Sequence, residues 1–140
     1  MGIVEIDTED GASVRTRPRV LLVDDDTTIR DVVGFMLDRL EYSTVSVTSG
    51  QAAIDAVMES TYEIVLMDVN MPEMDGIEAT RRIRAQVSQD HQPVIIAMTA
   101  NSTFSDELTC IGAGMNYFLP KPIRMAHLAA ALESGAAESG

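Results

Sequence analysis

Short apolar runs alternate with longer amphipathic segments along most of this chain. The apolar runs predict five strands, at residues 19–23, 44–48, 62–67, 93–98 and 116–119. Apolar residues at helical spacing predict five helices, at residues 27–41, 50–60, 76–87, 104–111 and 124–132. Strands that alternate with helices in this way are typical of right-handed βαβ units, which build a parallel sheet with helices on both faces.

Five strand–helix repeats indicate the α/β class. Their number favours a flavodoxin-like, doubly wound (βα)5 sandwich of three layers with strand order 2-1-3-4-5. Residues 18–134 would form this single domain. Residues 1–17 are polar and acidic without periodicity, so we expect a flexible arm or linker there. The small and polar residues 135–140 are expected to form a flexible tail.

The composition narrows the possible functions. The 140 residues carry a net charge of −12, which argues against a nucleic-acid-binding surface and against adhesion to anionic membranes. The one cysteine, Cys110, excludes an intrachain disulfide and a cysteine-based zinc site, and its apolar context favours a buried, inert thiol. No apolar run reaches the roughly 18 residues of a membrane span, and the acidic N-terminus does not resemble a secretory signal. We therefore expect a cytoplasmic protein.

Polar residues follow four of the predicted strands at the point where each strand ends. Asp24 and Asp25 follow the first strand, Asp68 the third, Thr99 the fourth and Lys121 the fifth. In the predicted topology these ends gather at one edge of the sheet, where open parallel sheets bind their ligands. Clustered carboxylates repel one another by roughly 1 kcal/mol or more per close pair, so a cation would stabilise them. An all-oxygen ligand set of this kind selects Mg²⁺.

A metal, a lysine and a threonine hydroxyl around one carboxylate suit an anion with several oxygens. Phosphoryl transfer needs this combination, because its catalysis consists mostly of positioning and charge neutralisation. Asp68 is then a candidate nucleophile that forms an aspartyl phosphate. No histidine is placed to compete, since His91 precedes the fourth strand and His127 lies on the last helix. We expect both histidines on the surface, and the arginines of residues 81–84 to face solvent as well.

Several motifs in order at matching spacing identify a resemblance to a known family. They are residues 21–25 (Leu-Leu-Val-Asp-Asp), 67–76 (Met-Asp-Val-Asn-Met-Pro-Glu-Met-Asp-Gly), 97–100 (Ala-Met-Thr-Ala) and 121–122 (Lys-Pro). Over residues 18–134 the chain closely resembles the receiver domain of two-component response regulators. Residues 70–76 and the ending at residues 119–123 (Leu-Pro-Lys-Pro-Ile) also resemble receivers attached to hybrid histidine kinases, which act in phosphorelays.

The resemblance implies a role for the residues at the strand ends. Asp68 would be the phosphoacceptor. Mg²⁺, or Mn²⁺ in its place, would be held by Asp25, by the Asp68 carboxylate and by the backbone carbonyl of Asn70. Asp24 would act mainly through the waters of the metal, and Lys121 would pair with the phosphoryl group and with Asp68.

The resemblance also implies a switch on the face built from the fourth helix, the fifth strand and the fifth helix. Thr99 would hydrogen-bond the phosphoryl group, and Phe118, at the family's switch-aromatic position, would turn inward as Thr99 moves. Plain core packing is the alternative role for Phe118. Asn70 and Asn101 would tune the lifetime of the phosphoryl group, and Asp26 would cap the first helix.

The implied partners belong to the same signalling systems. The phosphoryl donor would be a phosphohistidine of a histidine kinase or of a histidine phosphotransfer protein, and it would dock near Ile29, Val33, Pro122 and Ile123. A downstream output protein or a fused domain would respond to the switch. The chain would be no conventional enzyme but a signalling phosphoacceptor that promotes its own phosphorylation and slow dephosphorylation. Direct nucleic-acid contact and membrane insertion are not expected.

Two other functions stay open on the sequence. Residues 24–28 fit the Asp-x-Asp-x-Thr pattern of a haloacid-dehalogenase-type phosphatase, with Asp24 as nucleophile and Asp26 as acid/base. The chain is short for that family, however, and Asp68 would have no role in it. A protein-interaction module that is never phosphorylated could use the same fold, but it would not need the acidic pair together with Thr99 and Lys121.

Overall fold

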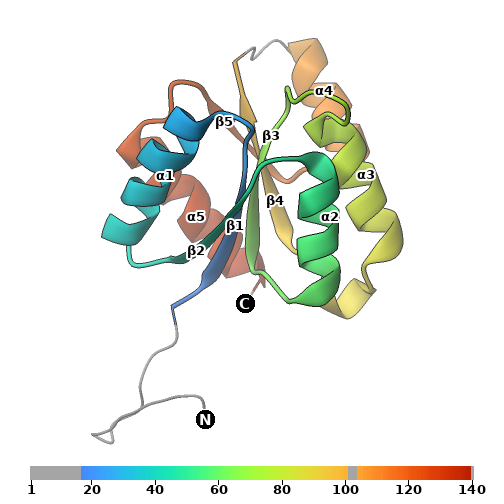
Figure 1. Ribbon diagram of the computed structural model, residues 1–140, viewed down its shortest axis with the longest axis horizontal. Helices are drawn as coiled ribbons and strands as arrows, with labels where there is room; N and C mark the ends of the chain where they lie inside the picture. The colour runs from blue at the N-terminus through green and yellow to red at the C-terminus, as the bar shows by residue number, and fades with distance from the viewer. Residues whose placement is uncertain (1–16, 101–103, 140) are drawn as a thin grey trace, which may run out of the picture.

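The computed structural model describes residues 17–100 and 104–139 of the chain. Within these ranges one five-stranded parallel sheet has the order β2-β1-β3-β4-β5, which confirms the predicted topology. The strands are β1 (Arg19–Val23), β2 (Ser43–Val47), β3 (Ile64–Asp68), β4 (Val94–Thr99) and β5 (Tyr117–Pro120). The helices are α1 (Thr27–Arg39), α2 (Gly50–Glu59), α3 (Gly76–Gln86), α4 (Phe104–Ala113) and α5 (Met125–Ser139), with a 3₁₀ helix, η1 (Gln89–His91), before β4. Figure 1 shows α1 and α5 on one face of the sheet and α2, α3 and α4 on the other, as a three-layer sandwich requires.

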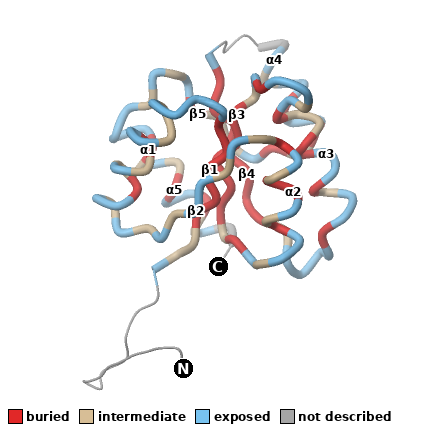
Figure 2. The backbone as a smooth tube through the Cα atoms, in the orientation of Figure 1, coloured by how far each residue is buried: buried red, intermediate tan, exposed pale blue. Residues whose placement is uncertain are grey.

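The core lies on both faces of the three central strands. All five residues of β3 and all six of β4 are buried, and Figure 2 shows the same concentration of buried backbone along the middle of the sheet. Because successive side chains of a strand point to opposite faces, Leu66 belongs to the cluster under α1 and α5, while Val65 belongs to the cluster under α2, α3 and α4. Burial on both faces explains why these strands read as unbroken apolar runs rather than as alternating patterns.

Most predicted element boundaries agree with the structure to within one or two residues, but α5 differs. The predicted end at residue 132 is wrong, because α5 continues to Ser139 and so includes residues 135–139, which were expected to form a tail. Gly135 is buried there, and a Cβ on it would lie 3.3 Å from side-chain atoms of both Ile64 and Val94. The small residue therefore lets the helix pack closely against the starts of β3 and β4. The predicted N-terminal arm lies outside the described residues except for Arg17, and none of the described helices has the length and apolarity needed to cross a bilayer.

Arg84 of α3 does not face solvent as predicted. Its guanidinium donates to the carbonyls of Pro93 at 2.7 Å and of Gly114 at 2.7 and 3.0 Å. It also donates to the side-chain oxygens of Gln92 at 2.7 Å and Asn116 at 2.9 Å. Burial lowers the pKa of Arg84, because a charged group loses hydration there, and the five bonds replace that hydration. One side chain thus ties the end of α3 to the start of β4 and to the turn between α4 and β5.

Candidate functional site

The carboxyl edge of the sheet brings together the polar residues that follow its strands. The register aligns Val23 of β1 with Met67 of β3, and Asp68 with Met98 of β4, so the ends of these strands lie side by side. Carboxylate oxygens of Asp24, Asp25 and Asp68 all lie within 4.8 Å of one another. The predicted acidic cluster is therefore present in the structure.

Lys121 enters this cluster from the end of β5. Its ammonium lies 3.0 Å from Asp68 Oδ1 and 3.2 Å from Asp24 Oδ2. Its backbone N–H donates to the Thr99 carbonyl at 2.8 Å, which holds the ends of β4 and β5 together. Asp24 and Asp68 are almost fully buried, with 0% and 2% exposed, whereas Asp25 is exposed. The site thus has a buried floor of two carboxylates and a lysine, and one carboxylate at its mouth.

The loop between β1 and α1 is organised by its own side chains. Asp26 accepts from the backbone N–H of Thr28 at 2.8 Å and of Ile29 at 3.4 Å, so it caps α1 as expected. Asp24 Oδ1 accepts from the backbone N–H of Asp26 at 2.9 Å. Asp24 Oδ2 is buried without a hydrogen bond of good geometry to the described residues and meets only the Lys121 ammonium. A buried carboxylate oxygen with no partner besides this ion pair, next to two further carboxylates, fits a hard divalent cation with bound waters.

The charges of the site are not balanced by the described protein groups alone. Burial raises the pKa of Asp68 to about 6, and the charge of Asp24 raises it too, while the hydrogen bond and charge of Lys121 lower it. Burial also lowers the pKa of Lys121, but the hydrogen bond to Asp68 and the charges of Asp68 and Asp24 outweigh it, so the net shift is upward. Two buried carboxylates therefore share one ammonium, which leaves the site with an excess of negative charge.

Removing Lys121 should raise the pKa of Asp68 above about 6, because the ammonium is the main group that favours the ionised carboxylate. The measurement is a ¹³C NMR titration of the Asp68 carboxylate in Lys121→Met and in the wild type, both in EDTA. Arg124→Met, which removes an exposed cation three residues away, is the control and should leave the titration in place. An unchanged midpoint in Lys121→Met would refute the assigned pairing.

The loop from β3 to α3 positions Asp68 through close backbone packing. The backbone N–H of Asn70 donates to Asp68 Oδ1 at 3.2 Å, and that of Gly76 donates to the Val69 carbonyl at 2.9 Å. Asp75 caps α3 by accepting from the Glu78 N–H at 2.8 Å. A Cβ at Gly76 would lie 2.2 Å from the Asp68 carbonyl oxygen, a distance that no side chain tolerates. The loop can close over Asp68 only with glycine at this position.

Alanine should therefore have opposite effects at two glycines. We expect Gly76→Ala to destabilise the fold by roughly 3 kcal/mol, because backbone must move to admit the methyl group. At Gly34, inside α1, an added methyl group would meet no atom within 4 Å, so Gly34→Ala should stabilise by about 0.5–1 kcal/mol. Urea unfolding of both variants measures the difference. Equal effects of the two changes would contradict the close approach at Gly76.

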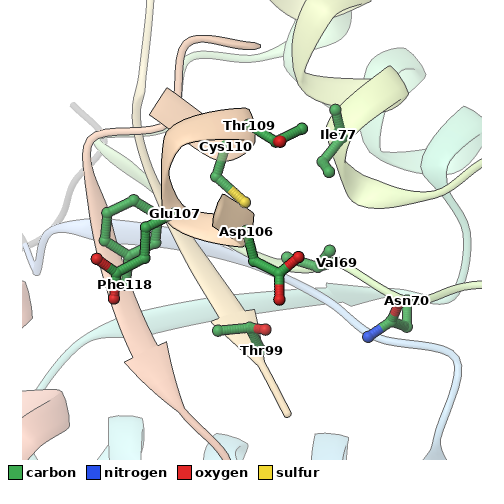
Figure 3. A pocket seen from close by; sticks show the side chains of 9 residues that line it. All are labelled: Val69, Asn70, Ile77, Thr99, Asp106, Glu107, Thr109, Cys110 and Phe118. Atoms are coloured by element: carbon green, nitrogen blue, oxygen red, sulfur yellow. The ribbon is translucent and has the colours of Figure 1, made fainter. Parts of the chain in front are cut away.

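A cavity of about 100 Å³ lies beside the acidic site, between β4, α3 and α4. Figure 3 shows the side chains of Thr99 and Phe118 on its border, with Cys110 and Asp106 on the α4 side. Phe118 is half-buried and packs against the core, whereas Thr99 is 5% exposed. Burial raises the pKa of the Cys110 thiol, and the charges of nearby acidic groups raise it further, in keeping with the predicted inert thiol.

A second hollow, of about 460 Å³, lies between α1 and the segment after β5. Ile29, Val33, Pro122 and Ile123 line it, as do Lys121 and Val32. Val33 is only 1% exposed and belongs to the core, so it lines this groove from beneath. Val32, 48% exposed, also lines the groove and lies at the surface. The helical spacing of Ile29, Val32 and Val33 predicts which face of α1 borders the groove. It does not predict which of the two adjacent valines is exposed.

Other predicted residues lie away from the acidic site or outside the described ranges. His91, on η1, and His127, on α5, are both exposed, as expected. Asn101 lies outside the described residues, so its predicted role stays a prediction. The sequence did not reveal Arg30, whose guanidinium reaches back from α1 to the β1–α1 loop. Its only signal is a position about one turn into the helix that follows the acidic motif.

Comparison with known proteins agrees with this geometry. Residues 20–133 match the response regulator receiver domain family. Sensor protein GacS of Pseudomonas syringae pv. syringae is 39% identical over 114 residues, which are 80% of this chain and 13% of GacS. The chain thus spans about an eighth of that curated relative.

Solved structures show the same fold. The receiver domain of sensor histidine kinase PA1611 from Pseudomonas aeruginosa PAO1, which has a magnesium ion in its active site cleft, is 36% identical, with a TM-score of 0.79 over 87% of this chain and 99% of that one. The receiver domain of Saccharomyces cerevisiae Ssk1, solved with the histidine phosphotransfer protein Ypd1, is 24% identical with a TM-score of 0.79, over 89% of this chain and 92% of that one. The chain belongs to the response regulator receiver domain family, the phosphoacceptor domains of two-component signalling.

Proposed function

We propose that Asp68 accepts a phosphoryl group from a partner's phosphohistidine, in the cytoplasm, with Mg²⁺ in the acidic site. The observation that supports this most strongly is the Lys121 ammonium, 3.0 Å from Asp68 Oδ1, beside three carboxylates that lie within 4.8 Å of one another. A buried carboxylate with a fixed cation and a metal-binding cluster is suited to attack an electrophile that carries several negative oxygens.

In this proposal, different residues of the site bind the metal and attack the phosphorus. Asp25, Asp68 and the backbone carbonyl of Asn70 would hold the metal, with Asp24 acting through its waters; Mn²⁺ would fit the same oxygen ligands. The bound metal supplies charge neutralisation for the carboxylates and for the phosphoryl oxygens. The Lys121 ammonium and the Asn70 N–H both contact Oδ1 of Asp68, so Oδ2 is the oxygen that would attack phosphorus. The phosphorus–nitrogen bond breaks, and the donor's imidazole leaves with the electron pair.

Lys121 and Thr99 stabilise the product. The Lys121 ammonium stays at the site of the new acyl phosphate and offsets the charge of its oxygens. Thr99, at the end of β4, lies at the same edge of the sheet, and its hydroxyl would donate a hydrogen bond to the phosphoryl group. In this proposal the domain promotes its own phosphorylation and its slow hydrolysis, and the polar side chains of Asn70 and Asn101 set the lifetime.

The donor docks on the groove beside Lys121. Ile29, Val32, Pro122 and Ile123 give this groove an apolar lining, and it opens next to the acidic site. A helix of a histidine kinase or of a histidine phosphotransfer protein would cover the groove and bring its phosphohistidine to Asp68. Apolar burial in the groove would supply most of the affinity, and the charged edge would orient the donor.

Phosphorylation then changes the face formed by α4, β5 and α5. The cavity of about 100 Å³ between Thr99 and Phe118 gives the aromatic ring a place to enter when Thr99 moves toward the phosphoryl group. Leu108 and Ile111 of α4 are 52% and 54% exposed, which offers an apolar surface to an output protein or a fused domain. A shift between two arrangements of this face would carry the signal.

Intact-mass measurement with acetyl phosphate and Mg²⁺ tests the proposal. The wild type and Asp55→Asn, which loses an exposed carboxylate of α2, should each gain one phosphoryl group. Asp68→Asn, and the wild type in EDTA, should gain none. An adduct that survives Asp68→Asn but not Asp24→Asn would favour a phosphatase of the haloacid-dehalogenase type. No adduct in a wild type that binds Mg²⁺ would favour an interaction module.

A further inference from the structure

Arg30 makes no ion pair with the described residues, although its guanidinium bonds the loop that carries Asp24, Asp25 and Asp26. Its Nη1 instead donates to the backbone carbonyl of Asp24 at 2.8 Å, and its Nη2 donates to Thr27 Oγ1 at 3.1 Å. The side chain is half-buried on the first turns of α1. The Arg30 guanidinium therefore stabilises the backbone of the β1–α1 loop and does not neutralise a carboxylate.

The carbonyl that Arg30 holds belongs to the peptide group between Asp24 and Asp25. Because a peptide group is planar, a bond to its oxygen also fixes the direction in which the chain enters Asp25. Asp24 is held in three further ways: its N–H donates to the Val47 carbonyl at 3.3 Å, its Oδ1 accepts from the backbone N–H of Asp26, and its Oδ2 lies 3.2 Å from the Lys121 ammonium. The Asp25 side chain is exposed and has no hydrogen bond or ion pair with the described residues. Without such contacts, the placement of the Asp25 carboxylate near Asp68 depends on the backbone that carries it.

We propose that Arg30 is a positioning residue for the cation site: it orients the Asp24–Asp25 peptide so that the Asp25 carboxylate faces Asp68. This inference rests on the proposed function only for the identity of the cation. The inference predicts the direction in which loss of Arg30 changes the affinity for the cation. As a positive charge near the site, Arg30 should weaken cation binding, whereas as a brace for Asp25 it should strengthen it.

The test is the affinity for Mg²⁺, measured by titration calorimetry without any phosphoryl donor. Arg30→Met should bind Mg²⁺ roughly tenfold more weakly than the wild type, the effect expected when a support for a metal ligand is lost. Arg30→Lys keeps the charge but replaces the two nitrogens that bond Asp24 and Thr27 with one, so its affinity should fall between the two. Arg39→Met is the matched control, because Arg39 leaves α1 at its far end and lies over the Phe35 ring. Its affinity should equal that of the wild type.

A double-mutant cycle separates positioning from a general loss of structure. If Arg30 acts through Asp25, Arg30→Met should cost no further Mg²⁺ affinity once Asp25→Asn is present. Equal or tighter binding by Arg30→Met, or a full additional loss in the Asp25→Asn background, would overturn the inference while leaving the proposed function intact. A wild type that binds no Mg²⁺ would overturn both.

Discussion

Replacing Asp68 with Asn is expected to stabilise the metal-free protein by up to about 3 kcal/mol near neutral pH. Folding buries this carboxylate, which is 2% exposed, next to Asp24, and its pKa rises from 3.8 to about 6. A tenfold change in an ionisation constant corresponds to about 1.4 kcal/mol. A shift from 3.8 to about 6 therefore means that ionised Asp68 disfavours the folded state by about 3 kcal/mol. Asn keeps the size and polarity of the side chain without its charge, and Lys121 retains Asp24 as a partner.

The sign of the pH dependence follows from the raised pKa. A group whose pKa is higher in the folded state contributes its stability fully below the unfolded value of 3.8 and loses it as the pH rises through about 6. The free energy of unfolding of the wild type should therefore fall below that of Asp68→Asn between about pH 4 and pH 7. Above that range the difference between the two should stay constant. Urea unfolding at several pH values in EDTA measures the gap, with Asp55→Asn as the control. A gap that does not change with pH, or a less stable Asp68→Asn, would refute this view of the site.

Arg84→Met should be among the most destabilising single changes, at about 3 kcal/mol or more. The substitution leaves the partly buried carbonyls of Pro93 and Gly114 and the side-chain oxygens of Gln92 and Asn116 without the guanidinium that now bonds them. Each bond to a charged donor contributes about 1.5–3 kcal/mol, of which rearranged side chains and water restore only part.

Arg82→Met provides the matched control for this change. Arg82 stands two residues earlier on the same helix and pairs with Glu78 at 2.9 Å, with both side chains more than 40% exposed. An exposed pair of this kind contributes only about 0.3–0.5 kcal/mol. In urea unfolding, the free energy of unfolding should therefore be much lower for Arg84→Met than for Arg82→Met. Similar stabilities would mean that the bonds of Arg84 are no stronger than those of a surface arginine.

The contrast between these two arginines shows where sequence reasoning ends. Arg81, Arg82 and Arg84 look alike in a helical pattern, and the pattern predicts a solvated face for all three. The partners of Arg84 lie 8 to 32 residues further along the chain, so its burial depends on how β4 and the α4–β5 turn pack against α3. Arg30 was missed for a related reason, since its partner is a backbone carbonyl that carries no residue-specific signal.

The acidic site could be predicted because each of its residues ends or follows a strand. Alternating strands and helices imply a parallel sheet, and a parallel sheet gathers Asp24, Asp68 and Lys121 at one edge regardless of the details of packing. The end of α5 could not be predicted in the same way. Its last residues are small and lack apolar periodicity, and Gly135 is helical because it fits against Ile64 and Val94, which only the folded structure brings there.

Chemical trapping of the modified residue tests most directly whether Asp68 carries the phosphoryl group. The wild type is incubated with acetyl phosphate and Mg²⁺ and then treated with borohydride, which reduces an aspartyl phosphate to homoserine. Peptide mass spectrometry locates the product. We predict homoserine at position 68 and at no other aspartate, with none formed in EDTA. Homoserine at position 24 or 25, or a covalent phosphate that borohydride does not reduce, would contradict the assignment of Asp68.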